Sequence, residues 1–258
     1  MSLRVERLFG VGTWQVASQV PRRRFGVPPD GPWDTESANL ARMLVGLGSV
    51  EPVFEVLQGS VELVAGSAGS VAVVGSGGHA TVQGQTYPLA SRIPVEANDH
   101  IAIQAHCAYF AFTAGQMSLA KLDWRPAEPS SLRFLPTESQ GNISGVTVSR
   151  SFSRAGVRLE GHPPGNKPER PSEPCCVGAI QQTPSGELIL IGPDGPTIGG
   201  YPKLGTIIEA DLCLIPRLKI GHVIELTPVS WDEAREAQSK RLAELESIKL
   251  LLNITRSV

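Results

Sequence analysis

Residues 53–82 read VFEVLQGSVELVAGSAGSVAVVGSGGHATV, a segment in which valine-rich runs alternate with glycine-containing breaks. Its runs Val53–Leu57, Ser60–Val64 and Ser70–Val74 have the composition of pleated, partly buried strands. Short strands separated by breaks at intervals of about ten residues are typical of a β-sandwich or barrel. The segment therefore predicts a β fold rather than alternating βαβ units.

The same pattern extends in both directions from this segment. Glycine (27) and proline (21) together make 48 of the 258 residues, which favours short strands over long helices. In the first half we expect further strands at Val5–Phe9, Thr13–Val16, Ala80–Val82, Ser91–Val95, His100–Ala105 and Ala108–Thr113. In the second half we expect strands at Gly145–Ser149, Val157–Leu159, Val177–Gln181, Glu187–Ile191, Thr206–Ile208, Leu212–Ile215 and Val223–Pro228.

One segment of the first half has helical spacing instead. Leu40, Met43 and Leu44 recur at the spacing of one helix face. Asp34 precedes them, and its side chain can accept hydrogen bonds from the amides of a first helical turn. We therefore expect a helix over Thr35–Val45.

The C-terminal segment predicts the only long helix. Ser230 and Glu233 have the spacing of a capping box, which begins a helix over about Trp231–Asn253. This helix carries an apolar stripe of Leu242, Leu245, Ile248 and Leu252. The stripe either packs on the chain's own barrel or binds a partner.

The region from Trp124 to Pro136 is the best candidate for a linker, because it holds three prolines and two serines. A boundary there divides the chain into two β domains and a terminal helix. The expected parts are a first domain at 1–126, a linker at 127–136, a second domain at 137–229 and the helix at 230–258.

Composition and charge exclude several classes of protein. Lys and Arg number 23 against 25 Asp and Glu, so the net charge of −2 argues against a nucleic-acid-binding protein. No apolar run is long enough to span a membrane, and the N-terminus lacks the apolar segment of a secretory signal. Because the cysteines are too few for a disulfide scaffold, we expect a reduced, cytoplasmic setting. These cysteines are Cys107, Cys175, Cys176 and Cys213.

No familiar catalytic motif is present. Gly75–Gly78 lacks the Gly-Lys-Ser/Thr of a phosphate-binding loop, so we interpret it as a β-turn. The five histidines have no metal-binding spacing, and no Cys-x-x-Cys pair occurs, so the sequence predicts no metal site. The nucleophile motif Gly-x-Ser-x-Gly is also absent, and no catalytic residue is assigned.

Two segments are richer in functional groups than a β fold requires. In the first, Arg154 and Arg158 would share one face of a strand, with Gly156 between them. Two guanidinium groups beside a position without a side chain suit a carboxylate or phosphate ligand. The alternative is a solvated strand face with ordinary salt bridges.

The second segment runs from Asp194 to Pro202. Its consecutive glycines, Gly199 and Gly200, let backbone amides approach a ligand, while Tyr201 can stack or donate a hydrogen bond. Thr197 lies in the same stretch. A plain surface loop is the alternative interpretation.

Several pieces of the chain, in this order, resemble the allophanate hydrolase subunit 2 family of biotin-dependent carboxyltransferase proteins. That family includes one of the subunits of bacterial 5-oxoprolinase, the antagonist of the kinase inhibitor KipI, and part of the carboxyltransferase region of urea carboxylase. The matching pieces are FGVPPDGPWD at 25–34, NLARMLVG at 39–46, Glu55 with Leu57 and Gly59, RAGVRLEG at 154–161, SEP at 172–174, GAIQ at 178–181, GGYP at 199–202, Asp211-Leu212 and VSWDEA at 229–234.

The resemblance implies a mainly β fold with two tandem cyclophilin-like barrel domains, and a partner barrel protein of the KipI-like, subunit 1 type. It implies a subunit of a 5-oxoprolinase-like, ATP-dependent amidohydrolase that acts on a small polar anionic substrate. The alternatives are a carboxyltransferase component that uses carboxybiotin on another protein, and a non-catalytic regulatory subunit. ATP would then be used in the complex, and biotin would be carried by a partner because this chain has no Met-Lys-Met acceptor.

Within that resemblance, Arg154 and Arg158 would bind the anionic group of the substrate. The pocket wall would be formed by the glycine-rich segment with its tyrosine, and hydrogen bonds would come from Gln181 and Asp194. The complete set of expected substrate-binding residues is Arg154, Gly156, Arg158, Gln181, Asp194, Thr197, Gly199, Gly200 and Tyr201.

The chain also departs from the family pattern, as a shortened and divergent member would. Val16 stands at an acidic position, Gly77 stands where an aspartate is common, and Gly195 replaces an arginine. These changes remove charge from the first domain and from one loop of the second. They favour the hypothesis that the first-domain half of the site is degraded, and they keep the regulatory alternative open.

Overall fold

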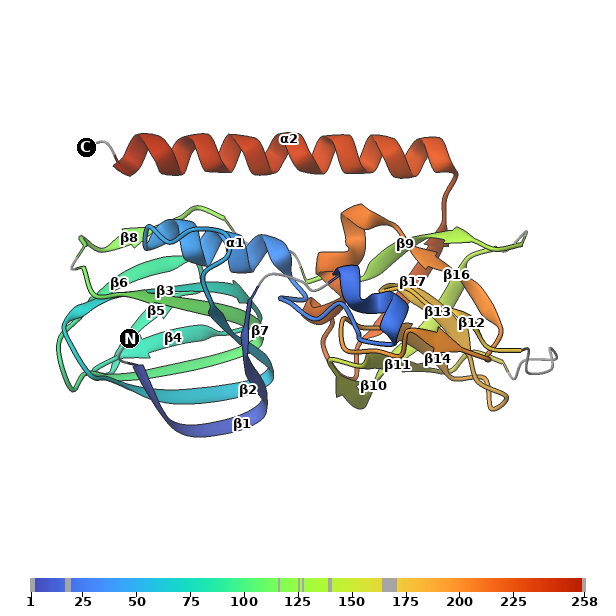
Figure 1. The fold of residues 1–258 in the computed structure, drawn as a ribbon, viewed down its shortest axis with the longest axis horizontal. Coiled ribbons are helices and arrows are strands. Elements are labelled where there is room, and N and C mark those ends of the chain that lie inside the picture. Colours follow the sequence, from blue (N-terminus) through green and yellow to red (C-terminus); the bar gives the residue numbers. More distant parts are fainter. Residues whose placement is uncertain are drawn as a thin grey trace. The chain divides into compact units, whose positions relative to one another are not determined.

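A computed structural model describes residues 3–16, 20–115, 117–124, 126, 128–138, 141–163 and 171–256, with the side chains of 20–21 and 251–256 left out. The chain forms two compact units, one of residues 1–18 and 34–128, the other of residues 19–33 and 129–258. Strands dominate both units (Figure 1), which confirms the expected mainly β fold.

The first unit is built on an eight-stranded sheet in the order β1-β2-β7-β3-β6-β8, with β4 paired to β7 and β5 paired to β4. Its core is a cluster of buried valine, isoleucine, leucine and phenylalanine side chains from these strands. The elements are β1 (Leu3–Gln15), α1 (Thr35–Leu44), β2 (Val53–Ala65), β3 (Gly69–Ser76), β4 (His79–Val82), β5 (Gln85–Pro88), β6 (Ser91–Val95), β7 (His100–Thr113) and β8 (Ala120–Lys121).

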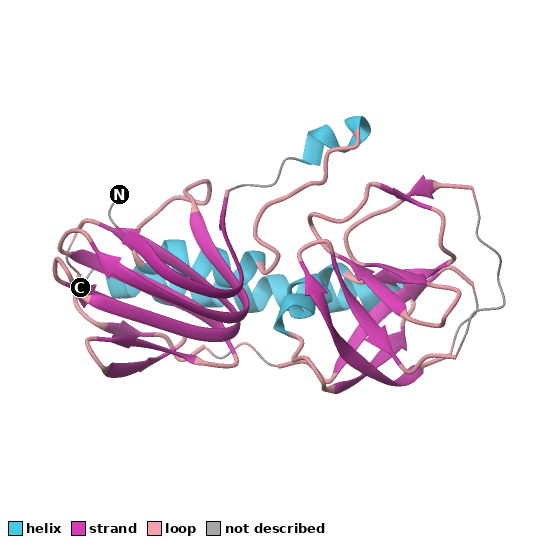
Figure 2. Cartoon of the chain, turned by 90° about the horizontal axis from the view of Figure 1, so that it is seen from below, coloured by secondary structure: helices cyan, strands magenta, loops and turns pink. Residues whose placement is uncertain are grey.

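Strands β1, β2 and β7 are each longer than the sequence predicts. Figure 2 shows that the long strands of the chain bend along their length. In each of β1, β2 and β7 two expected strands merge, because the positions interpreted as breaks lie inside a strand. Gly10 has a φ of +89° beside a register shift, and a Cβ on Gly59 would lie 1.9 Å from the carbonyl oxygen of Phe9. Glycine there permits a bulge and a close approach of two strands instead of ending them.

The helix α1 begins where the sequence predicts. The Asp34 carboxylate caps it, accepting hydrogen bonds from the Ser37 amide at 3.0 Å and from the Ser37 hydroxyl at 2.5 Å. Leu40 and Leu44 are buried, as the helical spacing requires. Val45, expected to be the last helical residue, is the C-cap.

The second unit is a closed barrel in the order β10-β11-β14-β13-β16-β9-β17, with a separate two-stranded sheet of β12 and β15. The strand β9 runs parallel to β17, and the other barrel pairs are antiparallel. The elements are η1 (Val20–Phe25), β9 (Ser131–Pro136), β10 (Ile143–Ser153), β11 (Gly156–Glu160), β12 (Glu173–Pro174), β13 (Ala179–Gln182), β14 (Leu188–Ile191), β15 (Ile198–Gly199), β16 (Lys203–Ile207), η2 (Glu209–Arg217), β17 (Val223–Pro228) and α2 (Trp231–Arg256).

The arrangement of the second unit differs from the sequence expectation in three places. The expected linker 127–136 contains β9, a barrel strand, and residues 19–33 group with this unit instead of the first. The expected strand Leu212–Ile215 is part of the 3-10 helix η2. The Asp211 carboxylate fixes that helical segment, because it accepts hydrogen bonds from the Arg133 amide at 2.7 Å and from the Arg133 guanidinium at 2.6 Å.

The C-terminal helix α2 begins at the predicted capping box. The Ser230 amide donates to the Glu233 carboxylate at 2.7 Å, and the Glu233 amide donates to the Ser230 hydroxyl at 3.3 Å. Ala234 and Ala237 pack the start of α2 against the rest of the second unit. Leu242 of the expected stripe, in contrast, is 52% exposed. Within the described residues, no helix is long and apolar enough to cross a membrane.

Candidate functional site

One row of side chains crosses four neighbouring strands of the second barrel. Arg158 on β11 lies opposite Ile189 on β14, and Ile189 lies opposite Gln181 on β13. Gln181 in turn lies opposite Lys203 on β16, next to a register shift. Directly opposed residues of antiparallel strands point to the same face of a sheet.

This row lies on the outer wall of the barrel. The residues that alternate with it point to the opposite face and are buried in the barrel core. They are Val157, Leu159, Ile180, Leu188, Leu190 and Leu204. Neighbouring strands are about 4.8 Å apart, so the backbones of Arg158 and Lys203 are roughly 14 Å from each other.

A short two-stranded element covers one end of this row. We call it the strap and define it as Glu173–Cys175 together with Thr197–Gly199. Its two segments pair through β12 and β15, and the Cys175 amide donates to the Thr197 carbonyl at 2.8 Å. The Cys175 side chain holds the strap to the outer wall, in an apolar cluster with Ala179, Ile189 and Ile191.

The carboxamide of Gln181 lies beneath the strap. Gln181 is only 4% exposed although it belongs to the outer wall. A Cβ on Gly199 would come within 2.5 Å of the Gln181 Nε2 atom, so a side chain at 199 would have to displace the Gln181 amide. Among the described residues, this buried nitrogen has no hydrogen-bond partner. A buried donor without an acceptor lowers the stability of a fold, and the packing of this region gives no reason to keep one here.

Two cations flank Gln181 in the row, and each is held by a carboxylate. The Lys203 Nζ atom lies 3.1 Å from the Glu173 carboxylate and donates to the Pro174 carbonyl at 3.1 Å, so both contacts are to the strap. The Arg158 guanidinium donates to the Glu187 carboxylate at 2.6 Å. These surface pairs are weak enough for a ligand to replace them.

Two cations act on the Cys175 thiol of the strap. Burial raises the pKa of the Cys175 thiol, and its neighbour Cys176 raises it further. Lys203 and Arg23 of η1 act in the opposite direction, because their charges favour the thiolate. Two cations therefore lie close enough to the strap to affect a group within it.

Arg154 has a different place from the one its sequence spacing suggests. It lies in the turn between β10 and β11, so the strand alternation that would put it on one face with Arg158 does not apply. Its guanidinium donates to the Asp194 carboxylate at 2.7 and 2.8 Å, to the Asp30 carboxylate at 3.2 Å and to the Gly31 carbonyl at 2.9 Å. With a side chain only 6% exposed, Arg154 joins two loops of the second unit.

The remaining expected residues lie in β11 and in or next to the strap. Gly156 allows β11 to approach β14, since a Cβ there would lie 2.7 Å from the Leu190 carbonyl oxygen. Thr197 belongs to the strap. Gly200 and Tyr201 follow the strap directly and are half-buried. The structure thus brings Gln181 together with Gly199, and Asp194 together with Arg154.

Sequence reasoning missed three charged residues of this region, one in the row and two that pair with it. Lys203 directly follows the Gly-Gly-Tyr-Pro segment, so its position was a usable signal. The carboxylates Glu173 and Glu187 are far from their partners in sequence, and only the strand register and the strap bring them to Lys203 and Arg158.

The glycine run of the first unit does not fit a phosphate group. A Cβ on Gly75 would lie 2.1 Å from the Cys107 carbonyl oxygen, and one on Gly78 would lie 1.8 Å from the Gln104 carbonyl oxygen. These glycines therefore allow β3 and the following bend to pack against β7. They do not form a cradle for a nucleotide.

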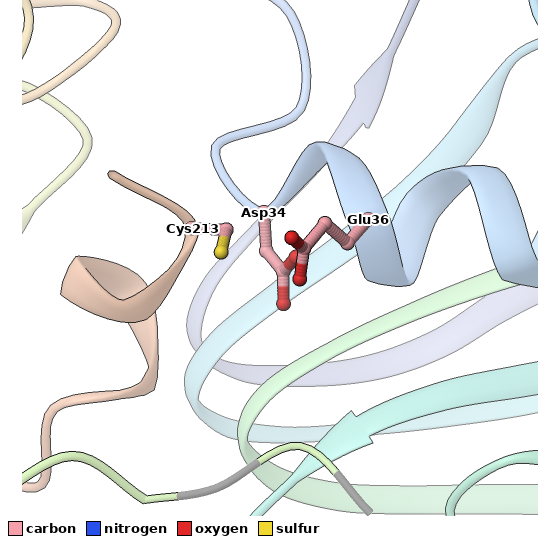
Figure 3. Close-up of side chains that lie close together, drawn as sticks. All are labelled: Asp34, Glu36 and Cys213. Atoms are coloured by element: carbon pink, nitrogen blue, oxygen red, sulfur yellow. The ribbon is translucent and has the colours of Figure 1, made fainter. Parts of the chain in front are cut away.

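The first unit contains a buried hydrogen-bond chain that the sequence did not predict. The fully buried Tyr109 hydroxyl donates to the Glu55 carboxylate and accepts from the Asp34 amide at 2.7 Å. Burial, followed by Glu55, raises the pKa of Tyr109 well above its usual value. Figure 3 shows Asp34 beside Glu36 at the start of α1, where free helix amides and the helix dipole stabilise negative charge. This chain fixes α1 to β2 and β7.

The amino-acid sequence is similar to parts of two kinds of enzyme. The chain is 31% identical to a 5-oxoprolinase subunit of Haemophilus influenzae over 109 residues, which is 42% of this chain and 35% of that protein. It is 25% identical to urea amidolyase of Saccharomyces cerevisiae over 306 aligned positions, which is 88% of this chain and 17% of that protein. The chain thus matches only about a third or less of the length of these relatives.

Solved structures show the same fold. The crystal structure of TTHA0988 superposes with a TM-score of 0.75 at 23% identity, covering 89% of this chain and 56% of that chain. The urea amidolyase of K. lactis superposes with a TM-score of 0.79 at 18% identity, covering 96% of this chain and 20% of that chain. At these identities the likeness concerns the fold alone.

The family described as "Carboxyltransferase domain, subdomain A and B" matches residues 25–118 and 140–228, which is well over half of the chain. These ranges include α1, the strands β2 to β7 and β10 to β17, the row on the outer wall and the strap. The chain belongs to this carboxyltransferase-domain family, as a shortened and divergent member.

Proposed function

We propose that the chain is a subunit of a 5-oxoprolinase-like, ATP-dependent amidohydrolase and acts with a partner barrel subunit. The observation that carries the proposal is the buried Gln181 Nε2 atom, which has no hydrogen-bond partner among the described residues and is set in one row with Arg158 and Lys203. A row rich in hydrogen-bond donors suits a small carboxylate with a carbonyl group, which is the chemistry of 5-oxoproline. The 31% identity to a 5-oxoprolinase subunit supports this choice of substrate.

In this proposal the residues of the row bind and orient the substrate. Lys203 and Arg158 supply positive charge for its carboxylate, and Gln181 donates to a substrate oxygen. Gly199 lies over the Gln181 amide, and Gly200 and Tyr201 follow it directly in the chain. The other expected residues do not contact the substrate. Arg154 and Asp194 hold their loop in place, and Thr197 helps to hold the strap. ATP would be used in the complex, and the glycine run of the first unit does not fit its phosphates.

The proposal is tested with the full chain as bait for its native complex. The eluate should hydrolyse ATP only when 5-oxoproline is present. Arg158→Ala should raise the KM for 5-oxoproline about tenfold, because a hydrogen bond to a charged group is lost. The exposed Arg235→Ala, on the first turns of α2, is the matched control and should leave the KM unchanged. A stoichiometric partner without any 5-oxoproline-dependent hydrolysis would contradict the proposal.

A second candidate function is supported by the extent of the other match. The alignment to urea amidolyase covers 88% of this chain, against 42% for the 5-oxoprolinase subunit. In this alternative the chain is a carboxyltransferase component, and the same row binds the carboxylate of carboxybiotin held on another protein. A biotinylated protein in the eluate would favour it. A stable partner with neither activity nor biotin would indicate a regulatory subunit.

A further inference from the structure

The contact between Lys203 and the strap is built from the same groups that a bound carboxylate would use. Lys203 Nζ lies 3.1 Å from the Glu173 carboxylate, and its side chain is only 18% exposed. The Glu173 side chain is 45% exposed, so it can leave this contact for water at little cost. Glu173 is therefore a carboxylate of the chain itself, seated on the cation of the proposed site.

The contact between Glu173 and Lys203 leaves the neighbouring Gln181 Nε2 atom without an acceptor. Glu173 pairs with Gly199 in the strap, and Gly199 lies directly over the Gln181 Nε2 atom. The Glu173 carboxylate does not bond to that nitrogen, which has no partner among the described residues. A ligand carboxylate has two oxygens and no backbone to constrain it. It can satisfy both donors at once.

The strap is held weakly enough to allow this exchange. Within the described residues, its two strands share two residue pairs, and it is anchored by the Cys175 side chain and by two contacts to Lys203. The hydrogen bond from Lys203 to the Pro174 carbonyl does not involve the Glu173 side chain, so the departure of that side chain does not by itself break it. The strap can therefore loosen at Glu173 without separating from the barrel.

We infer that Glu173 is a built-in competitor of the ligand: an incoming carboxylate displaces Glu173 from Lys203 and accepts a hydrogen bond from the Gln181 amide beneath the strap. The exchange forms and breaks ion pairs and hydrogen bonds only. It rests on the site proposed above, although it does not depend on the reaction catalysed there. It predicts that two substitutions at one ion pair have opposite effects on binding.

The test is a titration of the full chain with sodium acetate, followed through the side-chain amide resonance of Gln181 in nitrogen-15 NMR spectra. Gln181→Leu assigns that resonance by removing it. Sodium chloride at equal ionic strength is the reference for non-specific salt effects. Acetate should shift the resonance with a saturating curve, whereas chloride should not.

Two variants then test the separate roles of Glu173, which competes with the ligand, and Lys203, which binds it. Glu173→Gln should tighten acetate binding about two- to fivefold, since it removes a surface ion pair that binding must break. Lys203→Met should weaken binding about tenfold or more, since it removes a charged donor. Glu225→Gln, an exposed carboxylate on β17 that binds Asn142 at 2.6 Å, is the matched control and should change nothing.

Two results would overturn the inference. One is a Gln181 resonance that responds to acetate no more than to chloride in both the wild-type chain and Glu173→Gln. The other is a Glu173→Gln chain that is folded by circular dichroism but binds acetate more weakly than the wild type. If acetate binds as described while 5-oxoproline does not, the exchange stands and the oxoprolinase function loses its support.

Discussion

The guanidinium of Arg154 and the carboxylate of Asp194 are joined by two hydrogen bonds, from Nε to Oδ2 at 2.7 Å and from Nη2 to Oδ1 at 2.8 Å. The same Nη2 atom donates to the Gly31 carbonyl at 2.9 Å, so Arg154 ties residues 30–31 to the β14–β15 loop. Bidentate pairs of this kind fix geometry as well as charge. Arg154 therefore positions the loops of the second unit.

Replacing Arg154 should cost stability in a way that replacing Arg158 does not. Arg154→Met removes a nearly buried guanidinium and should lower the free energy of unfolding by about 1–3 kcal/mol. The pair of Arg158 with Glu187 is exposed at the surface, so Arg158→Met should cost less than about 1 kcal/mol. Urea unfolding of both variants gives the comparison. Equal losses would contradict the assigned roles.

Tyr109→Phe should destabilise the first unit. It removes one hydroxyl and leaves two buried groups, the Glu55 carboxylate and the Asp34 amide, each with one partner fewer. We expect a loss of about 1–3 kcal/mol in the free energy of unfolding. Tyr87→Phe is the matched control, because the half-buried Tyr87 packs on the same core without an equivalent buried hydrogen-bond chain among the described residues. A loss of the same size in the control would point to packing instead.

Tyr109 should also make the chain sensitive to alkaline pH. In the unfolded chain its phenol ionises at about pH 10, whereas in the folded chain burial and then Glu55 raise the pKa well above that value. Below pH 10 both states keep the proton, so the group has no effect. As pH rises further the unfolded state loses the proton first, and stability falls by up to about 1.4 kcal/mol per pH unit.

Urea unfolding between pH 9 and 11 measures this dependence. Tyr109→Phe should flatten the alkaline decline, and Tyr87→Phe should keep it. A decline of unchanged slope in Tyr109→Phe would assign it to other groups.

Gly59 should be intolerant of any side chain, whereas Gly48 should accept one. A Cβ at 59 would meet the Phe9 carbonyl oxygen at 1.9 Å, and one at 48 would meet nothing within 4 Å. Gly59→Ala must push β1 away from β2, and we expect a loss of about 2 kcal/mol or more. Gly48→Ala should leave stability within about 0.5 kcal/mol of the wild type. Thermal unfolding of both variants checks the difference.

The parts of the fold that the sequence predicted depend on local signals. Asp34 and Ser230 begin helices because a short polar side chain can cap the amides that follow it within three residues. The strand breaks at Gly10 and Gly59 were misread, because glycine serves equally in a turn and in the close contact of two continuous strands. Which of the two roles a glycine has depends on the strand that pairs with it, and that strand is far away in the sequence.

The candidate site was predictable to a smaller extent. Gln181 and Gly199 were both expected, yet their contact depends on the strap, which folds back over the outer wall. The Arg154 guanidinium lies against Asp30, 124 positions earlier in the chain, and no local pattern announces such a pair. Strand spacing also placed Arg154 on a face, whereas the turn before β11 removes it from the strand.

The central claim is that the Gln181 Nε2 atom, which has no partner in the described part of the chain, donates to a ligand. One paired measurement on Gln181→Leu tests it most directly. Among the described residues, Gln238 on α2 also has a buried side-chain atom without a partner, so Gln238→Leu is the matched control. Removing a side chain with a buried polar atom that lacks a partner, Nε2 in Gln181 and Oε1 in Gln238, should raise the free energy of unfolding of either variant by about 1–2 kcal/mol.

The account predicts that only Gln181→Leu also weakens the binding of 5-oxoproline to the native complex, by about tenfold or more in a calorimetric titration. Gln238→Leu should bind it as the wild type does. A Gln181→Leu chain that is more stable and binds 5-oxoproline with unchanged affinity would contradict the account.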